Sequence, residues 1–369
     1  MIKEELELLC IGNALVDVFA GLSEQQADRY GITQPVQHVE IQKLRGILSE
    51  LSGSTAGITE VSGGGAANVA KIAAFLGVNV CFSGALGKSA ETGNADEEGQ
   101  LFEKDLASAA VELKLALKPS PTGICLILNT GHNKTRIAAA PSAALEFSEA
   151  DLCEEDIQRA RVVVLDGFML DRGGIVRHIL RLADQGGTVA ALDLSSVSIA
   201  REYAAEIAGY VRQYSLILFM NEAEAVAFYD ELETQGLGLP PDEEENRPGE
   251  TSIENEKREE NSRLRRVCSF FQFFTGRDIF PIIVVKLGKR GALCFAGGAI
   301  HRAGTMEHKP LDATGAGDTF CAAFLAAWIR AKTLTECTAL GNRAARIILD
   351  VTGTLAEKKQ FKSIAHQLK

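Results

Sequence analysis

Short apolar runs alternate with amphipathic stretches of helical period through the middle of the chain. The pairs are Val162–Leu165 before a predicted helix over about 172–185, Thr188–Leu192 before one over about 199–213, and Ser215–Met220 before one over 222–230. Strands that alternate with helices in this way indicate a mostly parallel sheet with helices on both faces. The pattern therefore predicts an α/β fold.

Polar residues follow the apolar runs at the points where the predicted strands end. Asp166, Asp193, Asn221 and Lys286 all have this position. Ligands of parallel sheets bind beyond the carboxyl ends of the strands. We therefore expect these side chains to gather along one edge with the loop 312–318 and to line the active cleft.

Two regions, about 19–39 and about 122–140, interrupt this rhythm. In the second, residues 123–128 and 135–140 have the composition of strands, and a polar turn over 130–134 joins them. Alone, this pattern indicates an antiparallel hairpin.

A glycine loop precedes an apolar helix near the C-terminus. Gly315 and Gly317 allow a tight turn, and with Ala316 they direct backbone N–H groups outward at the helix start, where a phosphoryl group fits. The helix dipole favours an ionised Asp318, which can accept a proton from an attacking hydroxyl. Alone, this sequence could equally be an ordinary N-capped helix.

Two other glycine-rich segments do not complete known nucleotide loops. After Gly63, Gly64 and Gly65, Asn68 stands where a dinucleotide-binding loop needs Gly or Ala, and no strand is indicated directly before the loop. Both features disfavour a nucleotide-dependent oxidoreductase. Residues 84–89 lack the first glycine of a P-loop, because position 82 is a phenylalanine.

Composition and charge narrow the class of partner. The net charge of −11 argues against nucleic acid and anionic membranes, which need a basic face. The eight cysteines have no C-x-x-C spacing, so we expect reduced, mostly buried thiols. No signal peptide or long apolar span is evident, and we expect a cytoplasmic protein.

Residues 241–262 form an acidic segment with almost no apolar side chains. It holds nine acidic and three basic residues. A segment of this kind cannot bury enough apolar surface to fold alone. We expect a flexible, solvated insertion without a chemical role, although a regulatory contact stays open.

The stretch Asp312–Asp318 resembles, without a gap, the C-terminal signature of the ribokinase-like PfkB carbohydrate and nucleoside kinases, and the chain is most similar to the adenosine-kinase-like branch. The resemblance implies a single ribokinase-like body over 1–369 whose regions 19–39 and 122–140 form a small β-sheet lid. It also implies transfer of the γ-phosphoryl of ATP to a primary hydroxyl of a sugar or nucleoside. Asp318 is then the general base, and Gly315, Ala316 and Gly317 form the anion hole.

The resemblance also implies the acceptor site. Leu9–Val18 is predicted as a strand that ends in a polar turn, so that Asp17 lies at a strand end and can hold two vicinal hydroxyls. The other implied acceptor residues are Asn13, Gly64, Gly65, Asn68, the lid arginine Arg136, and Phe168, which either stacks on a base or belongs to the core.

The donor and metal sites follow from further matches. The implied ATP-binding residues are Asn221, Lys286, Gly288, Gly291 and Asn342. The Asn-x-x-Glu pair Asn221 and Glu224 is expected to organise Mg²⁺ through water, and Asp312 marks a potential K⁺ site. Lys286 stands where many relatives have a small hydroxyl residue, and it either reaches a phosphate or shields the cleft edge.

Several alternatives stay open at this point. The acceptor is a free sugar or a nucleoside, with adenosine as the specific alternative. A catalytically silent binding protein on the same scaffold is a rival of another class, although neither the base nor the magnesium pair is lost. The protein is expected to be a monomer or a homodimer. The contact between the extended loop 88–95 and the acceptor is not defined by the sequence.

Overall fold

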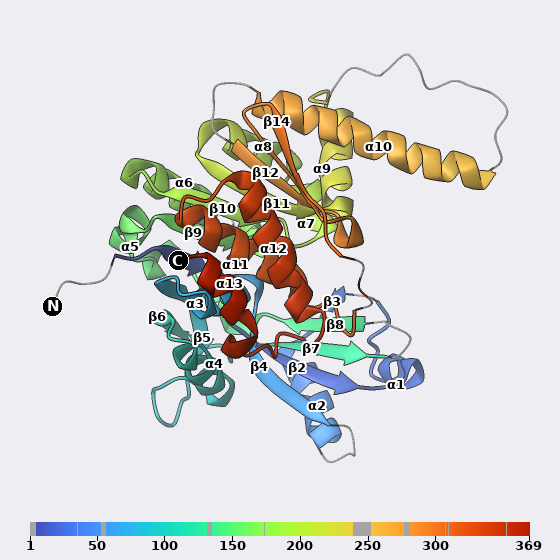
Figure 1. Ribbon diagram of the computed structural model, residues 1–369. Helices are drawn as coiled ribbons and strands as arrows, with labels where there is room; N and C mark the ends of the chain where they lie inside the picture. Colours follow the sequence, from blue (N-terminus) through green and yellow to red (C-terminus); the bar gives the residue numbers. More distant parts are fainter. Residues whose placement is uncertain are drawn as a thin grey trace.

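The computed structural model describes residues 5–34, 36–52, 57–130, 135–172, 174–238, 252–276, 281–306, 308, 310–351 and 353–369, with no side chains described over 252–262. A large sheet lies between two layers of helices, and a smaller sheet adjoins one end of this body (Figure 1).

The large sheet has nine strands within the described residues. Their order is β14 (Ala299–Ala303), β13 (Ala292–Ala296), β12 (Pro281–Lys286), β11 (Leu216–Asn221), β10 (Val189–Asp193), β9 (Val162–Asp166), β1 (Leu8–Ile11), β5 (Val80–Gly87) and β6 (Glu112–Lys118). All neighbours are parallel except the pairs β12–β13 and β13–β14. The predicted mostly parallel α/β fold is confirmed.

Alternate residues of the central strands enter two separate cores. In β1, Leu8 and Cys10 face one core, whereas Leu9 and Ile11 face the other. The first core is covered by α3 (Gly65–Phe75), α4 (Glu97–Ser108), α11 (Ala316–Ile329), α12 (Leu334–Ile348) and α13 (Lys362–Gln367). The second is covered by α5 (Glu154–Arg159), α6 (Ile175–Gly186), α7 (Val197–Glu202), α8 (Ala204–Gln213), α9 (Glu222–Thr234) and α10 (Ser252–Thr275).

The smaller sheet contains the predicted hairpin. Its strand order is β3 (Val36–His38), β8 (Thr135–Ala140), β7 (Gly123–Asn129), β2 (Leu15–Gly21) and β4 (Ile58–Gly63), and β7 and β8 are antiparallel as expected. Its outer face packs against α1 (Glu24–Arg29) and α2 (Ile41–Ser52). Of the predicted turn over 130–134, residues 131–134 lie outside the described residues.

Two expectations about strands are wrong. The predicted strand Leu9–Val18 is two strands, because the chain leaves the large sheet after β1 and enters the small sheet at β2, so Asp17 lies inside a strand rather than at its end. A strand, β4, leads directly into α3, where the sequence indicated none. β4 is antiparallel to β2, so this junction is not a dinucleotide-binding unit. The rejected P-loop segment 84–89 largely belongs to β5.

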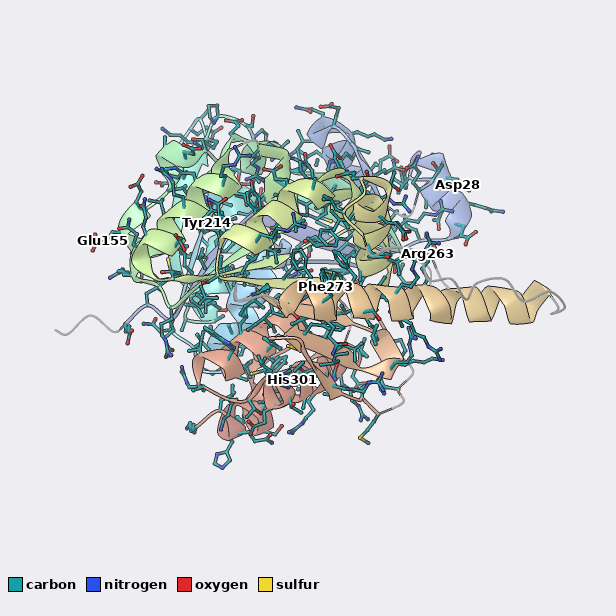
Figure 2. All side chains as sticks on the ribbon, turned by 90° about the horizontal axis from the view of Figure 1, so that it is seen from above. Asp28, Glu155, Tyr214, Arg263, Phe273 and His301 are labelled. Atoms are coloured by element: carbon teal, nitrogen blue, oxygen red, sulfur yellow. The ribbon has the colours of Figure 1, made fainter. Side chains whose placement is uncertain are left out.

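The second half of the acidic segment opens a long helix. Residues 252–262 are the first turns of α10, whereas 241–251 lie outside the described residues. In Figures 1 and 2 this end of α10 extends well beyond the body. The other end is fixed, because Arg263 pairs with Asp230 of α9 at 2.6 Å and the Phe271 side chain is fully buried.

The described residues contain no helix that is both long enough and apolar enough to span a membrane. All eight cysteines are free thiols, and most are buried as expected, but Cys153 is exposed.

Candidate active site

The N-terminus of α11 provides a place for an anion at the carboxyl edge of the large sheet. Gly315 is its N-cap in the left-handed conformation, with φ 75°. The N–H groups of a first helical turn have no carbonyl partner within the helix. Ala316 N–H, however, turns back to the Ala313 carbonyl at 3.2 Å. Of the three residues that the sequence assigned to the anion hole, Gly315, Ala316 and Gly317, only Ala316 thus has a backbone partner for its N–H group among the hydrogen bonds of the described residues. Asp318, in the same first turn, offers a further N–H group.

Asp312 fixes the loop that precedes this helix. Its Oδ1 accepts hydrogen bonds from Thr314 N–H at 2.9 Å and from the Thr314 hydroxyl at 2.8 Å, and its Oδ2 accepts one from Gly353 N–H at 2.8 Å. The Thr354 methyl group closes over Gly315, where an added Cβ would lie 2.5 Å from it. Both oxygens of Asp312 thus accept hydrogen bonds from backbone N–H groups, and Asp312 thereby fixes the shape of the loop.

Asp318 lies in the first turn of α11, with its carboxylate against the start of α3. Its Oδ2 accepts a hydrogen bond from Asn68 Nδ2 at 2.8 Å. Burial raises the pKa of Asp318 to about 6, the nearby Asp193 and Asp166 charges add to this, and the Asn68 bond and Lys286 oppose it. From the helix dipole alone, the sequence predicted that the ionised form of Asp318 is stabilised. Burial outweighs the dipole, but at neutral pH the carboxylate is still mostly ionised.

Asp17 lies on β2 against the glycine-rich junction of β4 and α3. A Cβ at Gly63 would clash with its carboxylate, and one at Gly64 would clash with the Asn13 carbonyl oxygen. Glycine is therefore required at Gly63 and Gly64, where this junction passes against the segment from Asn13 to Asp17. Burial raises the pKa of Asp17 to about 7, with a contribution from the Asp318 charge, while a hydrogen bond with Cys125 and the charge of Lys71 lower it.

Two buried amide oxygens lie beside these carboxylates without a hydrogen-bond donor. Among the described residues, no donor reaches Asn13 Oδ1 or Asn68 Oδ1, although Asn13 is only 5% and Asn68 only 7% exposed. A buried acceptor that stays unpaired costs about 1 to 3 kcal/mol. Asn68 bonds to Asp318, and the Asn13 backbone meets the Gly64 turn that adjoins Asp17, so these two oxygens indicate a ligand that brings hydroxyl groups.

Asp166, to which the sequence gave a position but no role, borders the same space. Its Oδ1 is also buried without a donor among the described residues, and a Cβ at Gly12 would lie 2.5 Å from its Oδ2. Burial raises the pKa of Asp166 to about 6, against the charge of Arg172. The acceptor side is thus strongly acidic.

Lys286 supplies a positive charge near Asp318. Its Nζ lies 2.6 Å from Asp193 Oδ2, and the Cys321 thiol donates to the same oxygen at 3.0 Å. Burial alone would lower the pKa of Lys286, but the Asp193 charge raises it above its usual range. A Cβ at Gly317 would lie 3.3 Å from Nζ, so the ammonium group adjoins the anion hole. The sequence predicted that Asp193 and Lys286 lie at the same edge but not that they pair, and it gave no signal for Cys321, which α11 brings to Asp193.

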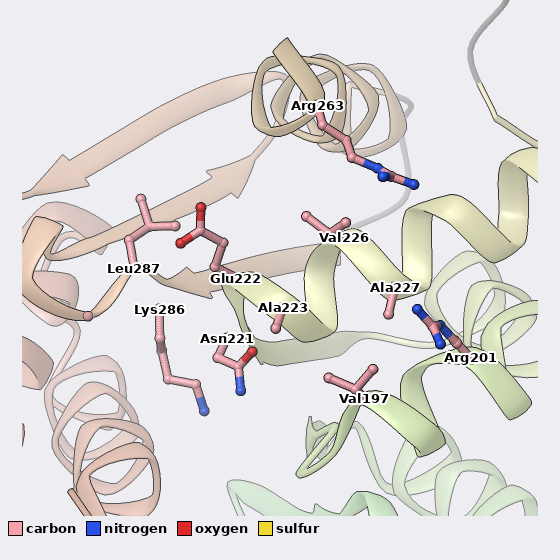
Figure 3. A pocket seen from close by; sticks show the side chains of 11 residues that line it. Val197, Arg201, Asn221, Glu222, Ala223, Val226, Ala227, Arg263, Lys286 and Leu287 are labelled. Atoms are coloured by element: carbon pink, nitrogen blue, oxygen red, sulfur yellow. The ribbon is translucent and has the colours of Figure 1, made fainter. Parts of the chain in front are cut away.

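Lys286 also lines an open cleft of about 860 Å³ between α7, α9 and α10 (Figure 3). Asn221, Gly288 and Arg201 line it as well, and Arg263 of α10 borders it. The helix that follows the acidic segment thus borders the predicted donor side, which the sequence did not indicate.

Asn221 and Glu224 form a reciprocal helix cap. Asn221 Oδ1 accepts from Glu224 N–H at 2.9 Å, and Glu224 accepts from Asn221 N–H at 2.8 Å and Asn221 Nδ2 at 2.7 Å. Burial raises the pKa of Glu224 to about 7, with a contribution from Asp193. The described residues hold no group of three His, Cys, Asp or Glu side chains placed for a metal. The pair therefore suits a metal held through water better than direct ligation.

Three predicted residues have structural partners in this conformation. Asn342 Nδ2 donates to the Ala303 carbonyl at 2.9 Å, and Arg136 pairs with Asp28 and donates to the Ile32 carbonyl. Phe168 is half-buried against the second core. A Cβ at Gly291 would clash with the Ala303 carbonyl, so this turn requires glycine for packing.

The face of the small sheet that carries Asp17 is otherwise mostly apolar. Asp17 pairs with Val61 and Cys125, and Phe19 pairs with Ile127, so these residues share one face. Phe19, Val61 and Ile127 form a buried cluster of their own. A cavity of about 510 Å³, also lined by Asp312, adjoins this face, and Phe19 contacts Gly353. The small sheet therefore lies against the loops that carry Asp312 and Gly353, which is the position that a lid over the anion-binding loop would have.

A parallel sheet covered by a β lid, with a helix N-terminus and a buried carboxylate meeting at its carboxyl edge, is the architecture of ribokinase-fold kinases. Residues 32–245 and 276–360 match the pfkB family carbohydrate kinases, and the chain belongs to this family. It is therefore a kinase, with ATP as the co-substrate that the family implies.

The similar proteins point to the adenosine-kinase-like branch. Adenosine kinase 1 of Arabidopsis thaliana is 24% identical over 96% of this chain and 97% of its own length. The structure of adenosine kinase from Sinorhizobium meliloti superposes with a TM-score of 0.77 at 23% identity, covering 99% of this chain and 100% of that one. A probable sugar kinase from Rhizobium etli reaches the same TM-score at 21% identity, with 99% of both chains covered.

Proposed function

We propose that this kinase transfers the γ-phosphoryl group of ATP to the primary hydroxyl of a nucleoside, with adenosine as the first candidate. The observation that carries the acceptor site is the pair of buried amide oxygens of Asn13 and Asn68, to which no donor in the described part of the chain reaches. Vicinal hydroxyls of a ribose can donate to these oxygens and to the Asp17 carboxylate, which would leave the CH₂OH group facing Asp318.

The inner face of the lid favours a nucleoside over a free sugar. A sugar has hydroxyls on every side and would leave them unpaired against Phe19, Val61 and Ile127. A nucleobase instead gains about 1 to 3 kcal/mol from stacking on an aromatic ring. Phe168, half-buried at the end of β9, is the aromatic residue we assign to this contact. The adenosine kinases among the similar proteins support the same acceptor class.

In the proposed mechanism Asp318 accepts the proton of the attacking hydroxyl, whose oxygen attacks the γ-phosphorus as the bond to the leaving ADP breaks. The backbone N–H groups of Gly317 and Asp318 and the ammonium group of Lys286 stabilise the charge on the transferred group. Asn68 positions Asp318 through its hydrogen bond. No covalent enzyme intermediate is needed.

The donor side is assigned to residues around the cleft of Figure 3. We place the ATP phosphates near Asn221, Lys286 and Gly288. Gly291 and Asn342 keep the shape of the adjoining turn. Arg136, now paired with Asp28, is the lid cation assigned to cover the phosphoryl group.

Two ions complete the proposal. Asn221 and Glu224 would hold Mg²⁺ through its water shell, and the ion would neutralise phosphate charge. A K⁺ ion near Asp312 would add positive charge beside the anion hole. We further propose one ribokinase-like body over 1–369, with the acidic segment 241–262 as an insertion, in the cytoplasm.

The test is ADP release from MgATP with nucleosides and free sugars as acceptors. Adenosine should turn over much faster than ribose or fructose, and the reverse order would assign a sugar kinase. Asp17→Ala should raise the acceptor KM by about 10- to 150-fold, because a hydrogen bond to a charged group contributes about 1.5 to 3 kcal/mol. An unchanged acceptor KM would refute the site, and ATP binding without any acceptor-dependent ADP release would favour a silent scaffold.

A further inference from the structure

A buried lysine lies behind the acceptor site in a helix of small residues. Lys71 belongs to α3, where every residue from Ala66 to Ala74 is buried. Its side chain is only 9% exposed, and its Nζ lies 2.6 Å from Asp105 Oδ2 of α4. A buried ammonium group is costly unless it is paired. Packing alone would have favoured an apolar residue here.

The same Asp105 oxygen holds the end of the lid strand β4. Oδ2 accepts hydrogen bonds from Ser62 N–H at 3.0 Å and from the Ser62 hydroxyl at 2.6 Å. Burial raises the pKa of Asp105, but Lys71 and Ser62 outweigh it and hold the pKa below its usual range. One ionised carboxylate thus joins β4, α3 and α4.

Ser62 occupies the point where the chain passes from the lid to the body. The next residue, Gly63, lies against the Asp17 carboxylate, and Gly64 crosses the Asn13 carbonyl. A movement of Ser62 would therefore shift Gly63 and Gly64 against the Asp17 carboxylate and the Asn13 carbonyl. The Asp105 contact holds Ser62, and with it this turn, in place.

Lys71 also acts on Asp17 through its charge. The titratable groups that face Asp17 are Asp318 of α11, Cys125 of β7 and Lys71 of α3. Of these, Asp318 disfavours the Asp17 carboxylate, whereas Cys125 and Lys71 favour it. Lys71 therefore helps Asp17 to stay ionised in a buried, acidic site.

We propose that Lys71 and Asp105 are positioning residues for the acceptor, which hold the segment Ser62–Gly65 in place without touching the substrate. This inference rests on the proposed role of Asp17. Acceptor binding should depend on the pair Lys71–Asp105, whereas ATP binding should not.

The experiment uses Lys71→Met in the full-length protein, with Lys104→Met, an exposed lysine of α4, as the matched control. At pH 7.5 Lys71→Met should raise the acceptor KM and the calorimetric Kd for adenosine about tenfold or more, which corresponds to about 1.4 kcal/mol. Lys104→Met should leave both constants unchanged. The ATP KM should stay within about twofold. The acidic limb of acceptor kcat/KM should move to higher pH, and Lys71→Arg should restore it.

If Lys71→Met does not fold, the double variant Lys71→Met/Asp105→Asn removes both charges, and the amide oxygen introduced on α4 can still accept from Ser62. It should show the same shift of the acidic limb and the same selective rise in acceptor KM. Equal rises in acceptor and ATP KM, or an unmoved limb, would overturn the proposal. A strong effect of Asp17→Ala with none in either of these variants would refute the pair alone, whereas no effect of Asp17→Ala would refute the acceptor site itself.

Discussion

Replacing Asp318, the proposed general base, by asparagine should lower the turnover number and raise the free energy of unfolding. The pKa of Asp318 rises from 3.8 to about 6, and each unit corresponds to about 1.4 kcal/mol. The ionised carboxylate therefore costs the folded state up to about 3 kcal/mol at pH 8, which contact with water reduces to about 1 to 2 kcal/mol. In Asp318→Asn the amide oxygen can still accept from Asn68, so most of this cost should disappear.

The sign of the pH dependence follows from the direction of the shift. The folded protein holds the Asp318 proton more tightly than the unfolded chain, so the cost is full above about pH 6 and vanishes as the pH falls towards 4. Urea unfolding should show Asp318→Asn more stable than wild type at pH 8, with the difference shrinking towards pH 5. Turnover at pH 8 should fall by about two to four orders of magnitude.

The control is Asp184→Asn, which removes an exposed carboxylate of α6 and should change neither property. A variant less stable than wild type at pH 8, or a gain that does not change with pH, would refute the burial argument. A loss of turnover below tenfold would refute the assignment of the base.

Four further outcomes are expected. Steady-state kinetics should show acceptor kcat/KM falling between pH 8 and 5.5, because the two site carboxyls, with pKa values of about 6 and 7, become protonated; a flat profile would contradict their roles. Lys286→Met should raise the ATP KM at least about tenfold and lower Tm by stranding Asp193, and an unchanged ATP KM would remove Lys286 from the donor site. Gly353→Ala should cost about 1 to 3 kcal/mol in urea unfolding, more than Gly297→Ala, because both have positive φ but only Gly353 meets the Phe19 ring; equal costs would exclude the contact. Deleting 241–262 behind a Gly-Ser bridge should leave Tm and turnover nearly unchanged, and a large fall in Tm would show that the segment packs.

The sequence predicted the large sheet well because its signal there is local. The apolar runs of β9, β10 and β11 are buried on both faces, so their positions follow from composition alone. The polar residues that end them come together as expected, since Asp193 pairs with Asp166 and Asn221 with Lys286 in the strand register.

The part of the small sheet outside the β7–β8 hairpin was harder to predict because its strands have weak or interrupted apolar patterns. β4 carries Glu60 and an exposed Thr59, so its alternation is weak, and the break between β1 and β2 is only three residues long. The partners of the site residues are also distant in sequence: 93 positions separate Lys286 from Asp193. The direction of the Asp318 pKa shift likewise depends on burial, which no local pattern reports.

The roles of Lys71 and Asp105 had a sequence signal that was not used. A single lysine in a run of alanines and other small apolar residues, directly after a glycine clamp, indicates a buried charge that needs a partner. Asp105 could not be identified as that partner, because the contact depends on the angle between α3 and α4.

The proposed reaction is the transfer of the γ-phosphoryl of ATP to a primary hydroxyl of a nucleoside. Mass spectrometry and ³¹P NMR of the products from adenosine and MgATP report this transfer directly. We expect adenosine 5′-monophosphate and ADP in equal amounts, and only background product with Asp318→Asn. Phosphate on a ring hydroxyl, or ADP with free inorganic phosphate and no nucleotide product from adenosine or any other nucleoside, would contradict the proposed reaction.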